Sequence, residues 1–250
     1  MAEAVLNWAG GKRHLLDELY RRLPAAFGAY HEPMVGSGAL FFDLEPDGGT
    51  INDTNPRLVG FYERVRDRPD DLVARLRELS GPESAPDPGL AFSETGRDGS
   101  AIQSYHYQQR ERFNRRPNGE AFDDLEEAAL LLYLNRTCYN GLYRENRSGE
   151  FNVPVGRYAN PDWVRADAVR AASRALDGAT VHNRDVAYVD ETAEPGDLVY
   201  LDPPYEPTSP PRRSPTTAPR GSTARTRHGC STWRDGWTAA ASTSLSATAA

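Results

Sequence analysis

The sequence predicts an α/β fold, with a mostly parallel sheet and an inserted helical subdomain. Short apolar stretches that end at Gly, Asp or Pro alternate with amphipathic segments, which is typical of parallel strands joined by helices. Between residues 65 and 160 the pattern is helical. We therefore expect an α/β domain formed by residues 1–64 and 161–207, interrupted by a helical subdomain at 65–160.

Each expected element rests on apolar spacing or on an end signal. Four leucines between residues 15 and 23 share one face of a helix that Pro24 ends. Asn55 followed by Pro56 is a typical helix start. Helices are expected at 12–23, from 38 to 44, after 55, and at 100–116, 119–135 and 162–176. Strands are expected at 30–34, 50–52, 180–183 and 198–201, and a loop at 80–99.

Composition limits the class of protein. The chain has 250 residues, two cysteines and a formal net charge of −7, which fits one domain with an insertion and offers no disulfide framework. Its longest apolar run, residues 128–134, is too short to span a bilayer, and its start lacks a signal-peptide pattern. We expect a cytoplasmic protein that does not bind membranes.

The tetrapeptide DPPY follows the last expected strand. Pro203 and Pro204 cannot continue a sheet ladder, so the chain turns rigidly there. Asp202 and Tyr205 therefore emerge at a strand's carboxyl end, where open α/β sheets bind ligands. The Asp202 carboxylate and the Pro203 carbonyl can accept both hydrogens of a planar exocyclic amine, and Tyr205 can stack on a base. Such positioning needs no metal, and no metal site is expected.

Two glycine-containing stretches precede expected helices. NWAGGK places Trp8 and Lys12 around a glycine pair, and EPMVGSG places Glu32 at a strand end before Gly36 and Gly38. Glycines let a ligand approach the backbone, and helix starts favour anionic groups. Glu32 can accept from an ammonium group, and Lys12 can pair with a carboxylate. For the first stretch, the alternative is a flexible N-terminus with Trp8 packed on the core.

Asp53 ends the next strand, 21 residues after Glu32. At about this spacing an acidic residue typically binds a ribose hydroxyl. The alternative is a carboxylate that only caps a helix. An amine, a carboxylate and a ribose are all parts of S-adenosylmethionine, so the combined residues indicate a site for that cofactor.

The ordered motifs NWAGGK, EPMVGSG, NDTN, YLNRTCYNGLYRENRSGEFNVPVGRY and DPPY resemble those of the Dam-type, D12-class DNA adenine-N6 methyltransferases over roughly residues 5–207. The resemblance implies a Rossmann-like S-adenosylmethionine methyltransferase sheet, target recognition by the 65–160 subdomain and double-stranded DNA as the partner. It implies no obligate protein partner; a cognate restriction endonuclease would be a separate protein. It assigns the cofactor contacts to Trp8, Lys12, Asp53 and Asp202, with Glu32, Gly36 and Gly38 lining the pocket and Asp185 beside the cofactor adenine.

The stretch 136–160 is rich in arginine and aromatic residues. Its Asn-Gly pair at 140–141 is a hairpin turn signal, which predicts a protruding ribbon that presents Tyr139, Leu142, Tyr143 and Arg144. Arginine reads guanine in the major groove, and aromatic rings can wedge into a gap left by a flipped base. The alternative is a solvated basic loop. By resemblance, the recognition sequence is GATC and the DNA contacts are Tyr139, Asn140, Leu142, Arg144 and Tyr158.

The resemblance ends near residue 207. Of residues 206–250, 35 are Ser, Thr, Ala, Pro or Arg, without a period of 2 or 3.6. We expect 208–250 to be disordered and to supply no strand, so that the C-terminal part of the sheet is missing. A frameshift in the coding DNA is our hypothesis for this segment, and a natural disordered tail is the alternative.

Two classes of function follow. The first is site-specific transfer of a methyl group from S-adenosylmethionine to a flipped adenine in DNA, with cytosine N4 as another amine that DPPY could serve. The second is a truncated, non-catalytic remnant that at most binds DNA through 136–160.

Overall fold

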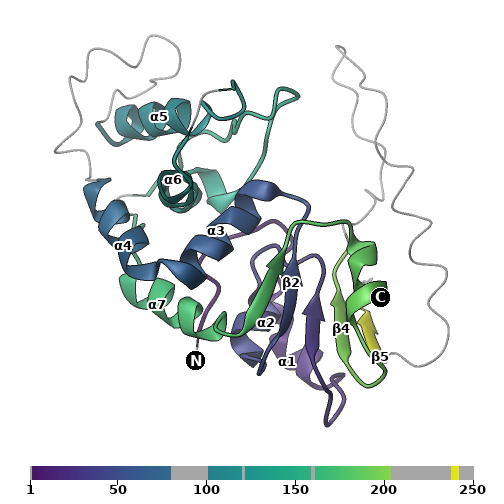
Figure 1. Cartoon of the computed structure of the whole chain (residues 1–250). Coiled ribbons are helices and arrows are strands. Elements are labelled where there is room, and N and C mark those ends of the chain that lie inside the picture. The colour runs from purple at the N-terminus through teal and green to yellow at the C-terminus, as the bar shows by residue number, and fades with distance from the viewer. Residues whose placement is uncertain (1, 80–100, 120–121, 159–160, 204–237, 242–250) are drawn as a thin grey trace, which may run out of the picture.

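The fold is built on a parallel sheet with the strand order β3-β2-β1-β4-β5 (Figure 1). This computed structural model describes residues 2–79, 101–119, 122–158, 161–203 and 238–241. The parallel pairing confirms the expected α/β class. The strands are β1 (Tyr30–Glu32), β2 (Gly49–Asn52), β3 (Ala179–His182), β4 (Leu198–Leu201) and β5 (Thr238–Ala241).

The central strand β1 pairs with β2 on one side and with β4 on the other. In register, Tyr30 lies beside Gly49 of β2 and Leu198 of β4. All strands run the same way, so the residues that follow β1, β2 and β4 emerge at one edge of the sheet. That edge carries the candidate site.

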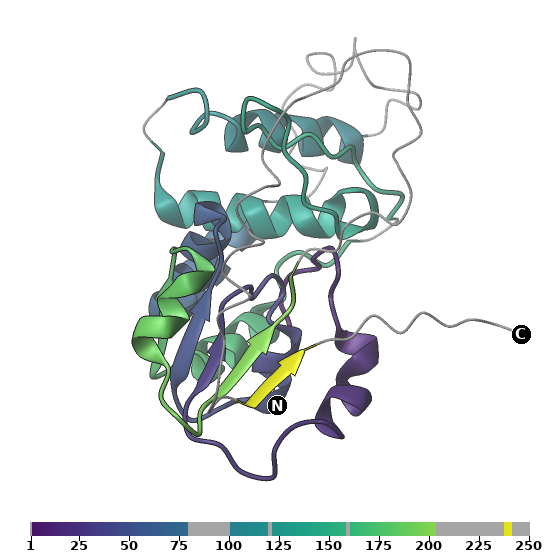
Figure 2. The ribbon, with the colours of Figure 1, turned by 90° about the vertical axis from the view of Figure 1, so that its right-hand side faces the viewer.

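Some helices pack around the sheet, and others form a separate group beside it (Figures 1 and 2). Asn55 begins α3 as expected, because its side chain accepts hydrogen bonds from the amides of Arg57 and Leu58. None of the helices in the described ranges has the length and apolar character needed to cross a bilayer. The helices are η1 (Arg13–Leu15), α1 (Leu16–Tyr20), α2 (Ala39–Leu44), α3 (Pro56–Asp67), α4 (Pro69–Glu78), α5 (Ala101–Phe113), α6 (Asp124–Thr137), η3 (Tyr139–Gly141), α7 (Ala166–Ala175), η4 (Val186–Tyr188) and α8 (Val189–Thr192).

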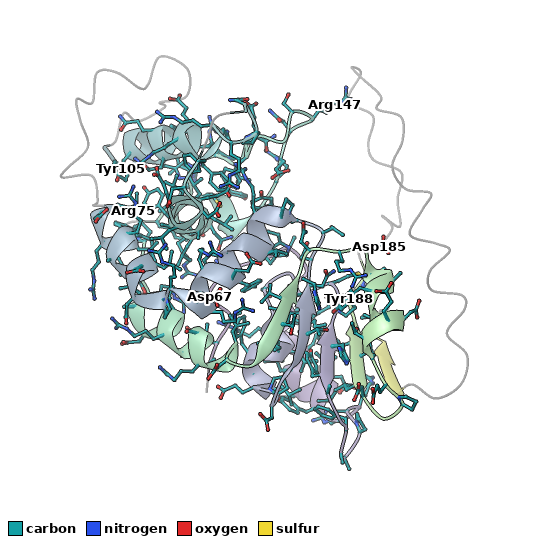
Figure 3. The ribbon with its side chains drawn as sticks, viewed as in Figure 1. Asp67, Arg75, Tyr105, Arg147, Asp185 and Tyr188 are labelled. Atoms are coloured by element: carbon teal, nitrogen blue, oxygen red, sulfur yellow. The ribbon has the colours of Figure 1, made fainter. Side chains whose placement is uncertain are left out.

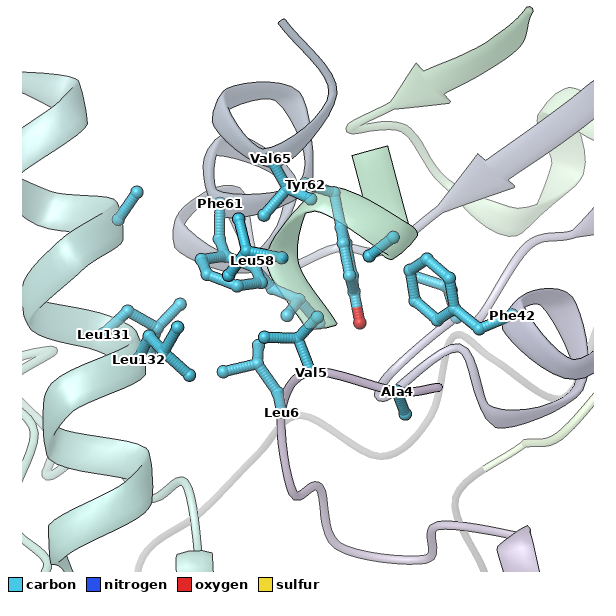
Figure 4. Close-up of a cluster of buried hydrophobic side chains, with 14 of the residues drawn as sticks. Ala4, Val5, Leu6, Phe42, Leu58, Phe61, Tyr62, Val65, Leu131 and Leu132 are labelled. Atoms are coloured by element: carbon cyan, nitrogen blue, oxygen red, sulfur yellow. The ribbon is translucent and has the colours of Figure 1, made fainter. Parts of the chain in front are cut away.

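Helices α4, α5 and α6 are here called the helical body, and α6 lies at its centre. Residues 127–135 are all buried, because α3, α4 and α5 each pack against this helix. A helix that is apolar on every side is a core helix. The N-terminal residues Val5 and Leu6 are also buried and lie close to Leu131 and Leu132 of α6 (Figure 4). The start of the chain therefore packs against the helical body before it enters the sheet region.

A buried ion pair joins α3 to α6. The Arg57 guanidinium bonds Glu127 Oε1 at 2.9 Å and the Phe113 carbonyl at 2.5 Å. It also lies over the Phe113 ring, 3.7 Å from the centroid. Removal of either partner alone would leave a buried charge unpaired, at a cost of about 3–5 kcal/mol.

One short strand does come from the C-terminal segment. Thr238–Ala241 pairs in parallel with Leu198–Leu201, so the expectation that 208–250 supplies no strand is wrong for these four residues. The physical reason is that an edge such as that of β4 presents a row of backbone donors and acceptors. A neighbour can pair with that row without any apolar period in its own sequence. The rest of 208–250 lies outside the described residues.

The pairing of β5 with β4 predicts opposite outcomes for proline at adjacent positions. In a parallel pair, alternate residues of an edge strand direct their amides to the neighbour, and the others direct them outward. We expect one of the two variants Ala239→Pro and Ala240→Pro to lower the melting temperature, by about 2–4 °C for each kcal/mol of unfolding free energy lost. The other variant should be tolerated. Scanning calorimetry measures this, and equal effects of the two variants would contradict the pairing.

Candidate functional site

A cavity of about 460 Å³ lies at the carboxyl ends of β1, β2 and β4. Glu32 ends β1, Asp53 follows β2 and Asp202 follows β4, and all three line the cavity. Of the eight predicted cofactor residues, Gly38 does not line the cavity. It precedes α2 with a φ of +65° and contacts Phe42. The structure thus brings together seven of the eight predicted residues: Trp8, Lys12, Glu32, Gly36, Asp53, Asp185 and Asp202.

Lys12 and Asp202 form an ion pair in the wall of the cavity. Lys12 Nζ lies 2.5 Å from Asp202 Oδ2 and 2.7 Å from the Gly10 carbonyl oxygen. The side chains are 8% and 18% exposed, so water screens the pair weakly. The lysine that was expected to pair with a ligand carboxylate is here bonded to the aspartate of DPPY.

Glu32 is a buried acid in the cavity wall. It accepts hydrogen bonds from the Tyr30 hydroxyl at 2.8 Å and from the Phe41 amide. Burial, opposed by the Tyr30 bond and reinforced by the nearby charge of Asp202, raises the pKa of Glu32 to about 8. Near neutral pH the protonated form of this carboxyl group is therefore favoured.

Asp53 shapes the glycine turn that follows β1. Its Oδ2 accepts from the Gly36 amide at 3.2 Å, and its Oδ1 accepts from the Asn55 amide at 2.9 Å. Burial nevertheless raises the pKa of Asp53. Gly36 has a φ of +49°, and a Cβ there would lie 2.9 Å from Cδ1 of Trp8. Only glycine fits between the turn and the indole.

Asn52 supports the site structurally, and sequence reasoning did not single it out. It is fully buried at the end of β2, donates to the carbonyls of Pro33 and Arg184, and accepts from the Arg184 amide. It thereby aligns the segments that follow β1 and β3 at the cavity edge. Asp185, the residue directly after Arg184, begins η4 by accepting from the Ala187 amide and lies on the cavity side of the sheet (Figure 3). A polar residue in a buried strand was the available signal for Asn52.

The predicted catalytic tetrapeptide is described only in part. Asp202 is half-buried at the cavity, and Pro203 is exposed beside it. Pro204 and Tyr205 lie outside the described residues.

The predicted ribbon exists, but its turn is elsewhere. Residues 138–146 and 150–156, here called the ribbon, run antiparallel through the bridges Cys138–Val155 and Glu145–Phe151. The chain reverses at Asn146, whose side chain accepts from the amides of Ser148 and Glu150. The Asn-Gly pair at 140–141 instead has two positive φ angles and lies in the tight turn η3, at the start of the ribbon directly after α6. The sequence placed the hairpin turn six residues too early.

Four of the five predicted DNA contacts are on the ribbon, and Tyr158 follows it. Tyr139, Leu142 and Tyr158 are 51%, 39% and 42% exposed, and they make up three of the four large apolar side chains exposed in the described ranges. Asn140 is exposed in η3. Arg144 is exposed and held by Asn152, at 2.6 Å from Nε to Oδ1. Arg147, at the turn, lies far from the sheet (Figure 3).

Tyr143 is not presented as expected. It stacks on Trp8 of the cavity with ring centroids 4.8 Å apart and an interplanar angle of 20°. Asn135, in the last turn of α6, is buried and bonds both the amide and the carbonyl of Asn7 at 2.8 Å. Tyr143 was expected on the ribbon but not against Trp8, and Asn135 was not singled out from the sequence. The signal for Asn135 was an amide at the end of a buried apolar run.

The raised pKa of Glu32 predicts a pH-dependent stability. Between about pH 4.5 and 8 the folded state keeps a proton that the unfolded chain releases, so Glu32 makes folding less favourable as pH rises through this window. We expect Glu32→Gln to melt several degrees above wild type at pH 8 and much closer to it at pH 5. Calorimetry on the exposed control Glu111→Gln should show no such pH dependence. Equal differences at both pH values would contradict the burial argument.

Comparisons with known proteins agree with this geometry. Residues 8–213 match the model of the D12 class N6 adenine-specific DNA methyltransferase family. The chain is 33% identical to the type II methyltransferase M1.LlaDCHI of Lactococcus lactis subsp. cremoris over 81% of its own length and 66% of the relative's. It is 36% identical to the type II methyltransferase M.MjaIII of Methanocaldococcus jannaschii over 81% and 68% of the two chains. It is 37% identical to the DNA adenine methylase of Escherichia coli K12 over 82% and 66%. The chain spans about two thirds of the length of these relatives. The chain belongs to the D12 class N6 adenine-specific DNA methyltransferase family.

Proposed function

We propose that this chain transfers a methyl group from S-adenosylmethionine to N6 of an adenine flipped out of double-stranded DNA, at the sequence GATC. The observation that carries the proposal is the convergence of Glu32, Asp53 and the Lys12–Asp202 pair on one cavity. Flipping explains how a base enters a cavity at the edge of a sheet.

The cavity suits the chemical groups of S-adenosylmethionine. Glu32 is buried with its pKa raised, and an ammonium group beside it would restore its charged form. Asp53 offers a carboxylate to ribose hydroxyls, and Asp185 lies beside the same space. Trp8 supplies an aromatic wall. When bound, the cofactor supplies an electrophilic methyl group.

Asp202 would make the adenine amine reactive. The lone pair of N6 is delocalised into the ring, so a planar amine is a poor nucleophile. A carboxylate accepts several hydrogen bonds. Asp202 can therefore hold Lys12 through Oδ2 and still accept one N6 hydrogen. The Pro203 carbonyl would accept the other hydrogen and Tyr205 would stack on the base. The negative carboxylate also stabilises the positive charge that develops on N6.

The ribbon would read the DNA. Its exposed Tyr139 and Leu142 suit apolar contacts in a groove, and its arginines suit guanine and phosphates. GATC as the target rests on the similarity of the ribbon sequence to GATC-specific family members. Relatives named as type II methyltransferases support a restriction–modification role, in which a cognate endonuclease would be a separate protein.

Two other functions remain as alternatives. Cytosine N4 is also an exocyclic amine that DPPY could position. A non-catalytic remnant that only binds DNA is favoured by the unusual composition of 208–250.

A transfer assay separates these functions. The full chain is incubated with S-adenosylmethionine carrying a tritiated methyl group and with duplexes that contain GATC or a scrambled site, and the nucleosides are then analysed. We expect N6-methyladenine from the GATC duplex alone. N4-methylcytosine would favour the cytosine alternative. DNA binding without any transfer would favour the remnant.

Removing the Asp202 carboxylate should stop the reaction while DNA binding persists. We expect Asp202→Ala and the closer analogue Asp202→Asn to lower the transfer rate by roughly 10²-fold or more, because an aimed electrostatic contact to the reacting amine is lost. Fluorescence anisotropy should show duplex affinity close to wild type. The exposed control Asp177→Ala should retain the rate, and near-normal turnover by both Asp202 variants would remove Asp202 from catalysis.

Arg144 and Arg147 should differ in what they read. We expect Arg144→Ala to relax discrimination at one guanine by about 1–3 kcal/mol, because the Asn152 contact holds the guanidinium for a bidentate base contact. We expect Arg147→Ala to weaken all sequences alike and to make the salt dependence shallower, as loss of a phosphate contact does. Binding to single-base variants of GATC at several salt concentrations measures both, and a uniform loss in Arg144→Ala would contradict its assignment to a base.

A further inference from the structure

The wall of the cofactor cavity formed by Trp8 and its neighbours is held by residues of the DNA-recognition region. We infer that Asn135 and Tyr143 are positioning residues of the cofactor site, although neither lines the cavity. The inference rests on the proposed function. Three separate contacts carry it.

The first contact is an amide clamp on Asn7, the residue before Trp8. Asn135 Oδ1 accepts from the Asn7 amide at 2.8 Å, and Asn135 Nδ2 donates to the Asn7 carbonyl at 2.8 Å. The same Nδ2 donates to the Gly141 carbonyl at 3.0 Å. Asn135 is 2% exposed, so loss of these bonds would leave buried backbone groups unsatisfied. One side chain thus fixes the cavity loop relative to the start of the ribbon.

The closeness of the two segments leaves little room for movement. Gly141 has a φ of +61°, and a Cβ there would lie 2.5 Å from Nδ2 of Asn7. The turn η3 therefore presses directly on the residue that precedes Trp8.

The second contact is the stack of Tyr143 on Trp8. The ring centroids lie 4.8 Å apart, in the range that favours aromatic pairs. The glycine turn at Gly36 meets the indole at Cδ1, so the turn and Tyr143 together confine the indole. Tyr143 in turn packs on Phe151 of the opposite arm of the ribbon, with centroids 5.7 Å apart. The orientation of the cavity's aromatic wall therefore depends on the ribbon.

The third contact is polar. The Tyr143 hydroxyl is hydrogen-bonded to the side chain of Asn55 and donates to Glu145. Asn55 donates its amide to Asp53 Oδ1 at 2.9 Å, and Asp53 lines the cavity. Tyr143 thus contacts Trp8 directly through its ring and is linked to Asp53 through Asn55. Both Trp8 and Asp53 line the cavity.

The test is the affinity of the full-length chain for S-adenosylhomocysteine, measured by calorimetry without DNA. We expect Asn135→Ala and Tyr143→Ala to weaken binding by roughly 5-fold or more, in the range of coupling between sites. Tyr143→Phe keeps the stack and should retain most of the affinity. A melting curve for each variant shows that the protein is folded.

Matched controls separate positioning from general stability. Leu72 of α4 is fully buried, does not line the cavity, and is neither part of the ribbon nor of the loop at 7–12. Leu72→Ala should lower the melting temperature, as loss of buried side-chain volume does, yet keep the cofactor affinity. Tyr20→Ala removes an exposed tyrosine and should also keep it.

The outcomes are distinct. If wild type binds S-adenosylhomocysteine, and Asn135→Ala and Tyr143→Ala bind it within about twofold of wild type, the inference fails and the proposed function stands. If Leu72→Ala weakens binding as much as Asn135→Ala, the effect is one of stability and the inference also fails. If wild type binds no S-adenosylhomocysteine, the proposed function fails and the inference with it. Should Asn135→Ala not fold, the comparison of Tyr143→Ala with Tyr143→Phe decides alone.

Discussion

The candidate site depends on the ion pair between Lys12 and Asp202, which joins two segments 190 residues apart in the chain. Lys12 is the only lysine in the sequence, and its ammonium is almost fully buried against the carboxylate that follows β4. A buried charge without a partner is costly, so the loop at 7–12 and the end of β4 must come together when the protein folds. The cavity is the space that this pairing encloses beside the glycine turn after β1.

The rest of the site is arranged around this constraint. The parallel sheet delivers Glu32, Asp53 and Asp202 to one edge, and the buried amide of Asn52 aligns the segments that follow the strands. Burial then opposes the charges that the strands bring together, which is why the pKa of Glu32 is raised to about 8. The helical body contributes as well, because Asn135 and Tyr143 support the same loop from the other side. The cavity and the ribbon thus share one structural element, the loop at 7–12.

The sequence predicted the parts of the fold that local rules determine. Strand β4 has the expected bounds at 198–201 because an apolar run meets two prolines, and Asn55 with Pro56 begins α3 as a typical cap. Local rules failed where distant segments decide. The Asn-Gly pair has the positive φ angles of a hairpin turn, but the side chain of Asn146 makes the reversal. The strand at 238–241 could not be predicted, because it has no apolar period and depends on the edge of β4 for its pairing. Nothing in the sequence spacing places Tyr143 on Trp8.

A double-mutant cycle on the ion pair tests this account most directly. The unfolding free energies of wild type, Lys12→Met, Asp202→Asn and the double variant are measured by denaturant titration. We predict that each single variant loses about 3–5 kcal/mol, because one buried charge is left unpaired, and that the double variant loses clearly less than the sum. Losses that add, or single variants as stable as wild type, would contradict the claim that this pair holds the site together.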